Sequence, residues 1–119
     1  MKKKIIVVTE DGSHTLFFPE LNEHYHSVHG AVAESMHVFI EAGLRTKLND
    51  CQPINVLEVG LGTGLNAALT LVEAENTKTI ISYFAVEPNP LLAEDILQLN
   101  YSDTSGSNRM KEVIPAIHA

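Results

Sequence analysis

The stretch Ile54-Asn55-Val56-Leu57-Glu58-Val59-Gly60-Leu61-Gly62-Thr63-Gly64-Leu65-Asn66 decides how this chain folds. Its first six residues form an apolar, β-prone run, and three glycines follow at alternate positions. Residues 65–75 then favour a helix. A strand that turns through glycines into a helix forms a cradle for a ligand. Glycine permits positive φ and close approach of the backbone, and a helix N-terminus offers bare N–H groups and the positive end of the helix dipole.

The spacing of the glycines distinguishes between ligands. A dinucleotide-binding turn has the pattern G-x-G-x-x-G, with an acidic residue about 20 residues later. Here Gly60, Gly62 and Gly64 leave one residue in each gap, and an acid, Glu58, lies within the strand itself. This E-x-G-x-G-x-G pattern resembles motif I of the methyltransferases that use S-adenosylmethionine (SAM). A buried acid suits the ammonium group of SAM and is unfavourable without a counter-charge. A turn built only for packing and an NAD site remain as alternatives.

A second apolar run, residues 79–86, ends at Glu87. Its near-continuous hydrophobicity predicts a parallel strand that is covered on both faces. Ligands of open α/β sheets bind at the carboxyl ends of the strands, and one carboxylate can accept hydrogen bonds from both hydroxyls of a ribose. We therefore expect Glu87 to bind ribose, although an acid here could also simply precede a helix. That helix is predicted to begin at Pro90, with Asn89 as its cap, and to reach about Leu99.

The region before the glycine-rich stretch predicts a hairpin and a helix. Residues 5–9 and 14–18 are β-prone runs on either side of Asp11-Gly12, a dipeptide typical of hairpin turns. A polar loop is expected over residues 19–30. Residues 31–42 predict a helix, because apolar side chains recur along one stripe: Val32, Met36, Phe39 and Ile40.

Other stretches predict helix ends, loops and one short element. Gly43 is placed to end the first helix in a left-handed conformation. Residues 45–53 read as a polar linker, and residues 102–108 as a loop. Residues 110–114 predict a short element that Pro115 interrupts.

The polar loop contains three closely spaced histidines, His24, His26 and His29. Imidazoles at short spacing can bind metal, but no cysteine accompanies them and H-x-H-x-x-H is not a standard zinc spacing. We therefore predict no metal site, and we interpret these histidines as solvated or hydrogen-bonding residues.

Composition sets wider bounds. The chain has 119 residues, of which 45% are hydrophobic and 19% charged, as expected for one small globular domain. No apolar run approaches the roughly 20 residues of a membrane span. Cys51 is the only cysteine, so an intrachain disulfide is excluded and a cytoplasmic location is expected. The net charge of −7 argues against the chain gripping nucleic-acid phosphates by itself.

These features together resemble one family, the tRNA wobble-uridine 5-aminomethyl-2-thiouridine methyltransferases, which occur alone or fused to an FAD-dependent oxidoreductase domain. The resemblance includes Tyr25-x-Ser27, Glu34, Val38-Phe39 and the run from Leu57 to Asn66. It implies that one set of residues contacts SAM or lines the cofactor or substrate pocket: Glu58, Gly60, Gly62, Thr63, Gly64, Asn66, Glu87 (at the ribose), Tyr25, Ser27 and Glu34. No catalytic residue is assigned.

The resemblance also implies an α/β fold, namely the N-terminal part of a Rossmann-like SAM-dependent methyltransferase preceded by a β-hairpin and a helix. We expect a single, incomplete domain over residues 1–119, in which residues 1–50 form the hairpin and helix and residues 51–119 begin the β-α-β core. Because two parallel strands with open edges fold poorly, we expect a longer polypeptide or a second copy of the chain to complete the sheet.

The implied reaction is methyl transfer to the amine of 5-aminomethyl-2-thiouridine at the tRNA wobble position, with tRNA and an oxidoreductase domain as partners. Two other functions remain open: a non-catalytic SAM-binding or scaffolding module, and a nucleotide-binding module of an FAD/NAD oxidoreductase.

Overall fold

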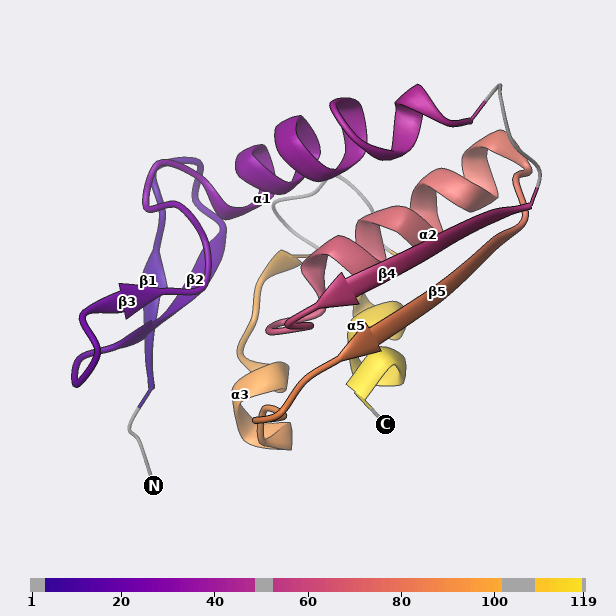
Figure 1. Cartoon of the computed structure of the whole chain (residues 1–119). Helices are drawn as coiled ribbons and strands as arrows, with labels where there is room; N and C mark the ends of the chain where they lie inside the picture. The colour runs from indigo at the N-terminus through magenta and orange to yellow at the C-terminus, as the bar shows by residue number, and fades with distance from the viewer. Residues whose placement is uncertain (1–3, 49–52, 102–108, 119) are drawn as a thin grey trace.

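The computed structural model describes residues 4–48, 53–101 and 109–118, and within them the strands form two separate sheets (Figure 1). The first sheet is antiparallel in the order β1-β2-β3, with β1 at Ile5–Val8, β2 at His14–Phe18 and β3 at Glu23–His24. The second pairs β4 (Ile54–Val59) with β5 (Ile81–Val86) in parallel. The expected α/β class is confirmed. Cys51 and the loop predicted at residues 102–108 lie outside the described residues.

The hairpin forms where the sequence predicts it, with Ile5 opposite Phe17 and Val8 opposite His14. The expectation of an irregular loop over residues 19–30 is wrong in one respect, because that segment contains the short strand β3. Aromatic contacts accompany this pairing. The rings of Phe17 and His24 stack with their centroids 4.5 Å apart, and those of Phe18 and Tyr25 lie 5.3 Å apart.

The hairpin turn caps the first helix, α1 (Ala31–Glu34). Asp11 accepts a hydrogen bond from the Ala33 N–H (2.9 Å), and the hydroxyls of Thr9 and Ser13 accept from the two preceding N–H groups of the helix. Burial acts to raise the pKa of Asp11, but hydrogen bonds from Ser13, Ala33 and Thr9 outweigh it and lower the pKa to about 2. This cap ties the orientation of the helix to the hairpin.

The helix predicted over residues 31–42 is helical, but its winding changes. After α1 it continues as the π-helical segment η1 (Ser35–Glu41), and the 3-10 turn η2 (Leu44–Thr46) follows. Gly43 separates them with φ −108°, so the predicted left-handed ending is wrong. The need for glycine there is steric, because a Cβ would lie 2.7 Å from the Phe39 carbonyl oxygen.

The strand-helix-strand unit follows the prediction closely. β4 has the expected bounds, and α2 (Leu65–Thr77) extends two residues beyond the expected helix, until Lys78 adopts a left-handed conformation. Its buried face includes Leu65, Ala68 and Leu69, and α2 packs against η1 and the C-terminal helix α5 (Met110–His118).

The C-terminal helices depart from the prediction. The helix expected from Pro90 begins later, as α3 (Ala93–Leu97), with Leu92 rather than Asn89 at its N-cap. The last helix, α5 (Met110–His118), continues through Pro115. Proline removes one intrahelical hydrogen bond, but the buried side chains of Met110, Val113 and Ile114 anchor this helix in the core.

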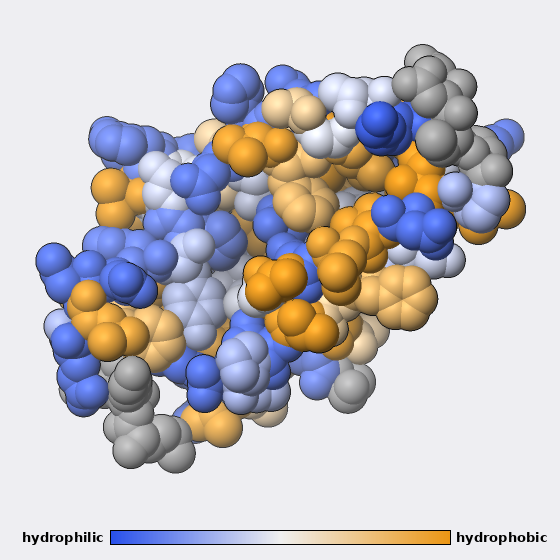
Figure 2. Space-filling model, in the orientation of Figure 1, coloured by the Kyte–Doolittle hydropathy of each residue, from blue (hydrophilic) through white to orange (hydrophobic). Residues whose placement is uncertain are grey.

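One face of the β4-β5 sheet is open, so the expectation of strands covered on both faces is wrong for the described residues. Leu57 is 70% exposed and lies beside Phe84, which is 63% exposed. Val59 and Val86 extend the same apolar row, and Figure 2 shows it as a hydrophobic patch over the two strands. No helix among the described residues is long and apolar enough to cross a membrane.

Candidate functional site

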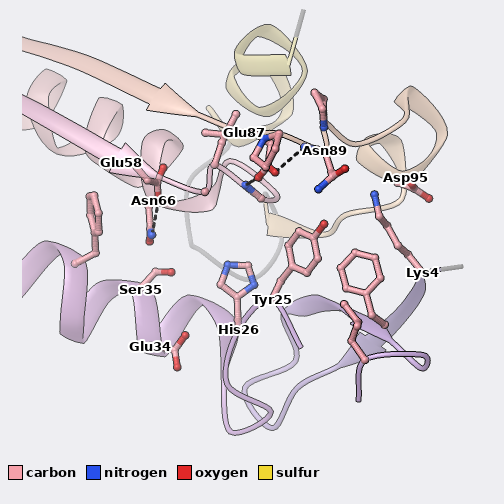
Figure 3. A pocket seen from close by; sticks show the side chains of 18 of the residues that line it. Lys4, Tyr25, His26, Glu34, Ser35, Glu58, Asn66, Glu87, Asn89 and Asp95 are labelled. Carbon is pink, nitrogen blue, oxygen red and sulfur yellow. Dashed lines mark hydrogen bonds between the residues drawn. The ribbon is translucent and has the colours of Figure 1, made fainter. Parts of the chain in front are cut away.

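A cavity of about 1000 Å³ lies where β4 and β5 end (Figure 3). Its walls come from the first three residues of the glycine turn (60–62) with the flanking Glu58 and Asn66, from the segment after β5, from the N-terminal sheet region and from the first helix. Since this is the carboxyl end of a parallel sheet, it is where an open α/β fold binds its ligand.

A buried carboxylate, Glu58, lines the cavity at the end of β4 and is only 7% exposed. The Tyr83 hydroxyl donates to its Oε1 (2.7 Å), and the Asn66 side-chain amide donates to its Oε2 (2.8 Å). Burial, and then this bond to Glu58, raises the pKa of Tyr83 and keeps its hydroxyl a donor. Both donors are neutral, and no ion pair to Glu58 forms among the described residues.

Asn66, next to Glu58, has a polar side-chain atom without a partner among the described residues. Its Oδ1 is buried and accepts no hydrogen bond from any described residue. An unpaired buried acceptor is unusual in a folded protein. Here it lies beside Glu58 in the cavity wall, so a hydrogen-bond donor on a ligand would satisfy it (Figure 3).

The glycine turn is not helical, and Gly60, Gly62 and Gly64 have φ values of 86°, 57° and 84°. Their N–H groups, however, are bonded within the protein, to the Val86 carbonyl (2.8 Å), Glu87 (2.7 Å) and the Leu61 carbonyl (3.0 Å). These three N–H groups are therefore already paired within the protein. The turn contributes space and shape instead. A Cβ at Gly62 would lie 3.0 Å from the Tyr25 ring.

Glu87 connects the two strand ends. Its Oε1 accepts from the Gly62 N–H, and its Oε2 accepts from the Asn89 N–H (3.1 Å). Each carboxylate oxygen keeps a further lone pair, so Glu87 can still accept hydrogen bonds from two neighbouring hydroxyls of a ligand.

The structure brings most of the predicted site residues together. Seven of the ten line the cavity: Tyr25, Glu34, Glu58, Gly60, Gly62, Asn66 and Glu87. The other three do not. Ser27 accepts a hydrogen bond from the His29 N–H. Thr63 contacts Tyr101 and His118, and Gly64 lies next to His118.

Several lining residues were not predicted, and His26 is the most informative. Burial lowers its pKa against the opposing effect of Glu34, and its Nδ1 lies 3.2 Å from the Thr15 hydroxyl. One sequence signal could have identified His26: it lies between Tyr25 and Ser27, which belong to the motif that resembles the family. Lys4 and Asp95 also line the cavity, and nothing in the local sequence marks either, since they come from opposite ends of the chain.

The three loop histidines make separate contacts. His24 stacks on Phe17, His26 contacts Thr15, and His29 pairs with Glu10. Within the described parts of the chain, no group of three or more His, Cys, Asp or Glu side chains is placed to hold a metal ion.

Comparison with known proteins relates the chain to one set of tRNA-modification proteins. It is 31% identical over 91 residues to the tRNA 5-methylaminomethyl-2-thiouridine biosynthesis bifunctional protein MnmC of Burkholderia multivorans, which covers 73% of this chain and 14% of that protein. The MnmC protein of Burkholderia mallei is 32% identical over 95 residues, and this match covers 76% of this chain and 14% of that protein. The chain therefore spans about a seventh of the curated relatives it matches. No protein-family model matches.

A solved structure agrees with the sequence matches. The crystal structure of MNMC2 from Aquifex aeolicus superposes with a TM-score of 0.69 at 30% identity, covering 78% of this chain and 32% of that one. Because sequence and three-dimensional arrangement point to the same proteins, this chain is a homologue of part of the MnmC tRNA 5-methylaminomethyl-2-thiouridine biosynthesis proteins.

Proposed function

We propose that the cavity binds SAM and that this chain contributes the cofactor site of a methyltransferase acting on the amine of 5-aminomethyl-2-thiouridine at the tRNA wobble position. The observation that carries the proposal is Glu58, a buried carboxylate that lines the cavity and whose two hydrogen-bond donors, Asn66 and Tyr83, are both neutral. A buried anion without a counter-charge is costly, so a cationic ligand group is the natural partner.

The remaining lining residues fit the same ligand. Four carboxylates, Glu34, Glu58, Glu87 and Asp95, line the cavity with one amine, Lys4, which favours a ligand that carries positive charge. The cavity volume of about 1000 Å³ lies at the upper end of the usual range for ligand sites. The unpartnered Asn66 Oδ1 suits an amino-group donor, and Glu87 suits a ribose.

SAM, when bound, supplies an electrophilic methyl group on its sulfonium sulfur. The role of this chain's own residues is to bind SAM and to orient it. Glu58 and Asn66 would hold the amino-acid end of the ligand, and Glu87 its ribose. Holding an amine and a methyl group in line accounts for much of the rate gain in such displacements. The substrate amine must be neutral to attack, so its proton must pass to an acceptor. We assign that role to no residue of this chain.

Substrate and partners extend the proposal. The net charge of −7 means that tRNA phosphates would be held mainly by residues of another domain or chain. The relatives are named bifunctional, and we propose that this chain likewise works with an oxidoreductase domain.

Calorimetric titration with SAM, S-adenosylhomocysteine and NAD tests the proposal. The wild-type chain should bind the first two and prefer them to NAD. Glu58→Gln preserves the shape and removes the charge, so it should weaken both ligands about tenfold or more, by roughly 1.5–3 kcal/mol for a charged hydrogen bond. SAM and S-adenosylhomocysteine both carry the amino group, so the substitution should reduce the affinity for each by the same factor. Glu20→Gln, at an exposed loop position outside the cavity, is the matched control.

Two results would contradict the proposal. Preference for NAD would eliminate a SAM site, and equal SAM affinity in the wild type and Glu58→Gln would remove its main support. Methyl transfer from labelled SAM to tRNA that carries 5-aminomethyl-2-thiouridine would then separate an enzyme from a silent binder.

A further inference from the structure

Thr63 and Gly64, the part of the glycine turn that does not line the cavity, contact residues far away in the sequence. His118, on α5, places its Nε2 2.7 Å from the Thr63 carbonyl oxygen. The Tyr101 hydroxyl lies 3.1 Å from the Thr63 hydroxyl and 2.9 Å from the His14 carbonyl oxygen. Thr63 and Tyr101 are each only 1% exposed, so the contact between their hydroxyls is shielded from water, whereas the contact with His118 is partly buried.

We propose that Tyr101 and His118 are positioning residues that hold the glycine turn in its ligand-binding shape. Thr63 directly follows Gly62 in the chain, and the Gly62 N–H donates a hydrogen bond to Glu87 at the cavity. A displacement of Thr63 would therefore move both the turn and the carboxylate that it fixes. The identity of the ligand in this inference rests on the proposed function, but the role of Tyr101 and His118 in holding the turn does not.

The need for such a support follows from the residues of the turn. Gly62 and Gly64 both have positive φ, and glycine loses more backbone freedom on ordering than any other residue. A turn with alternating glycines requires external contacts to remain in one conformation. The structure also shows why Gly64 cannot carry a side chain without disturbing them, because a Cβ would lie 3.0 Å from His118 Nε2 and 3.3 Å from the Ile117 side chain.

Affinity depends on the fraction of molecules in the competent conformation, because the apparent dissociation constant rises as that fraction falls. Loss of one buried hydrogen bond changes such an equilibrium about threefold to tenfold. Tyr101→Phe retains the ring and removes the hydroxyl, and His118→Ala removes the imidazole. Each should speed amide hydrogen exchange at Gly62 and Gly64 by about that factor in the ligand-free protein, and weaken SAM binding in parallel.

Two further variants make the test specific. His118→Gln retains an N–H donor and should restore part of the protection, which a purely space-filling role would not predict. His37→Ala removes an exposed histidine outside the cavity and should leave the turn amides unchanged.

Faster exchange confined to the turn supports the inference even if the wild type binds no SAM, in which case only the proposed ligand fails. Unchanged exchange at Gly62 and Gly64 in both Tyr101→Phe and His118→Ala overturns it. A uniform rise at every amide also overturns it, since that indicates global destabilisation.

Discussion

Alanine substitutions at Gly60 and Gly64 offer a matched test of what each glycine does. Their φ values are nearly equal, 86° and 84°. Their surroundings differ, because a Cβ at Gly60 would meet nothing within 4 Å, whereas one at Gly64 would press against His118 and Ile117. The two substitutions therefore share the conformational cost, and only the second adds a steric one.

The magnitudes follow from this difference. A left-handed conformation costs an alanine about 1–2 kcal/mol, partly offset in both variants by the smaller entropy of the unfolded chain. In Gly64→Ala the end of α5 must also shift, and the 2.7 Å bond between His118 and Thr63 is lost, which adds about 1 kcal/mol. For a chain of 119 residues this extra amount lowers the Tm by roughly 4 °C.

Thermal unfolding of the ligand-free protein by circular dichroism measures the effect. Gly64→Ala should melt about 4 °C below Gly60→Ala. In a His118→Ala background the difference should shrink, because residues that share a contact do not act additively. Equal Tm values for the two single variants would refute the reasoning, and an undiminished difference in the His118→Ala background would show that His118 is not the cause.

Three further predictions follow from particular contacts. Asp11→Asn should lower the free energy of unfolding by about 1 kcal/mol by weakening the helix cap. Wild-type stability should also fall as the pH drops from 3.8 toward 2, a loss that the variant lacks. The folded-state pKa of His26 lies below 6.5, so protonation of this histidine favours the unfolded state. The urea midpoint should therefore stay constant above pH 6.5 and decrease below it, and the decrease should be smaller in His26→Gln. Phe84→Ser, at a 63% exposed position, should change stability by under about 0.5 kcal/mol, whereas Leu65→Ala in the core should cost about 2–5 kcal/mol; comparable losses would contradict the open sheet face.

Local sequence predicted the elements whose formation depends on local physics. Asp11-Gly12 fixed the hairpin, because this dipeptide adopts the turn that joins two twisted strands. The apolar run before Gly60 and the glycine spacing after it predicted a strand, a left-handed turn and a helix. The predictions failed where a distant contact decided the outcome. Pro115 remains within α5 because the side chains around it are buried against α2 and the core.

The sequence by itself determined the strand-turn-helix unit and the resemblance that pointed to MnmC-like proteins, since both reside in consecutive residues with characteristic spacing. Only the tertiary structure decided which of those residues line the cavity. It placed Glu58 and Glu87 in one cavity, and it placed Thr63 against Tyr101 and His118. The physical reason is that backbone preference acts between neighbours along the chain, whereas the direction of a side chain depends on which distant segment packs beside it.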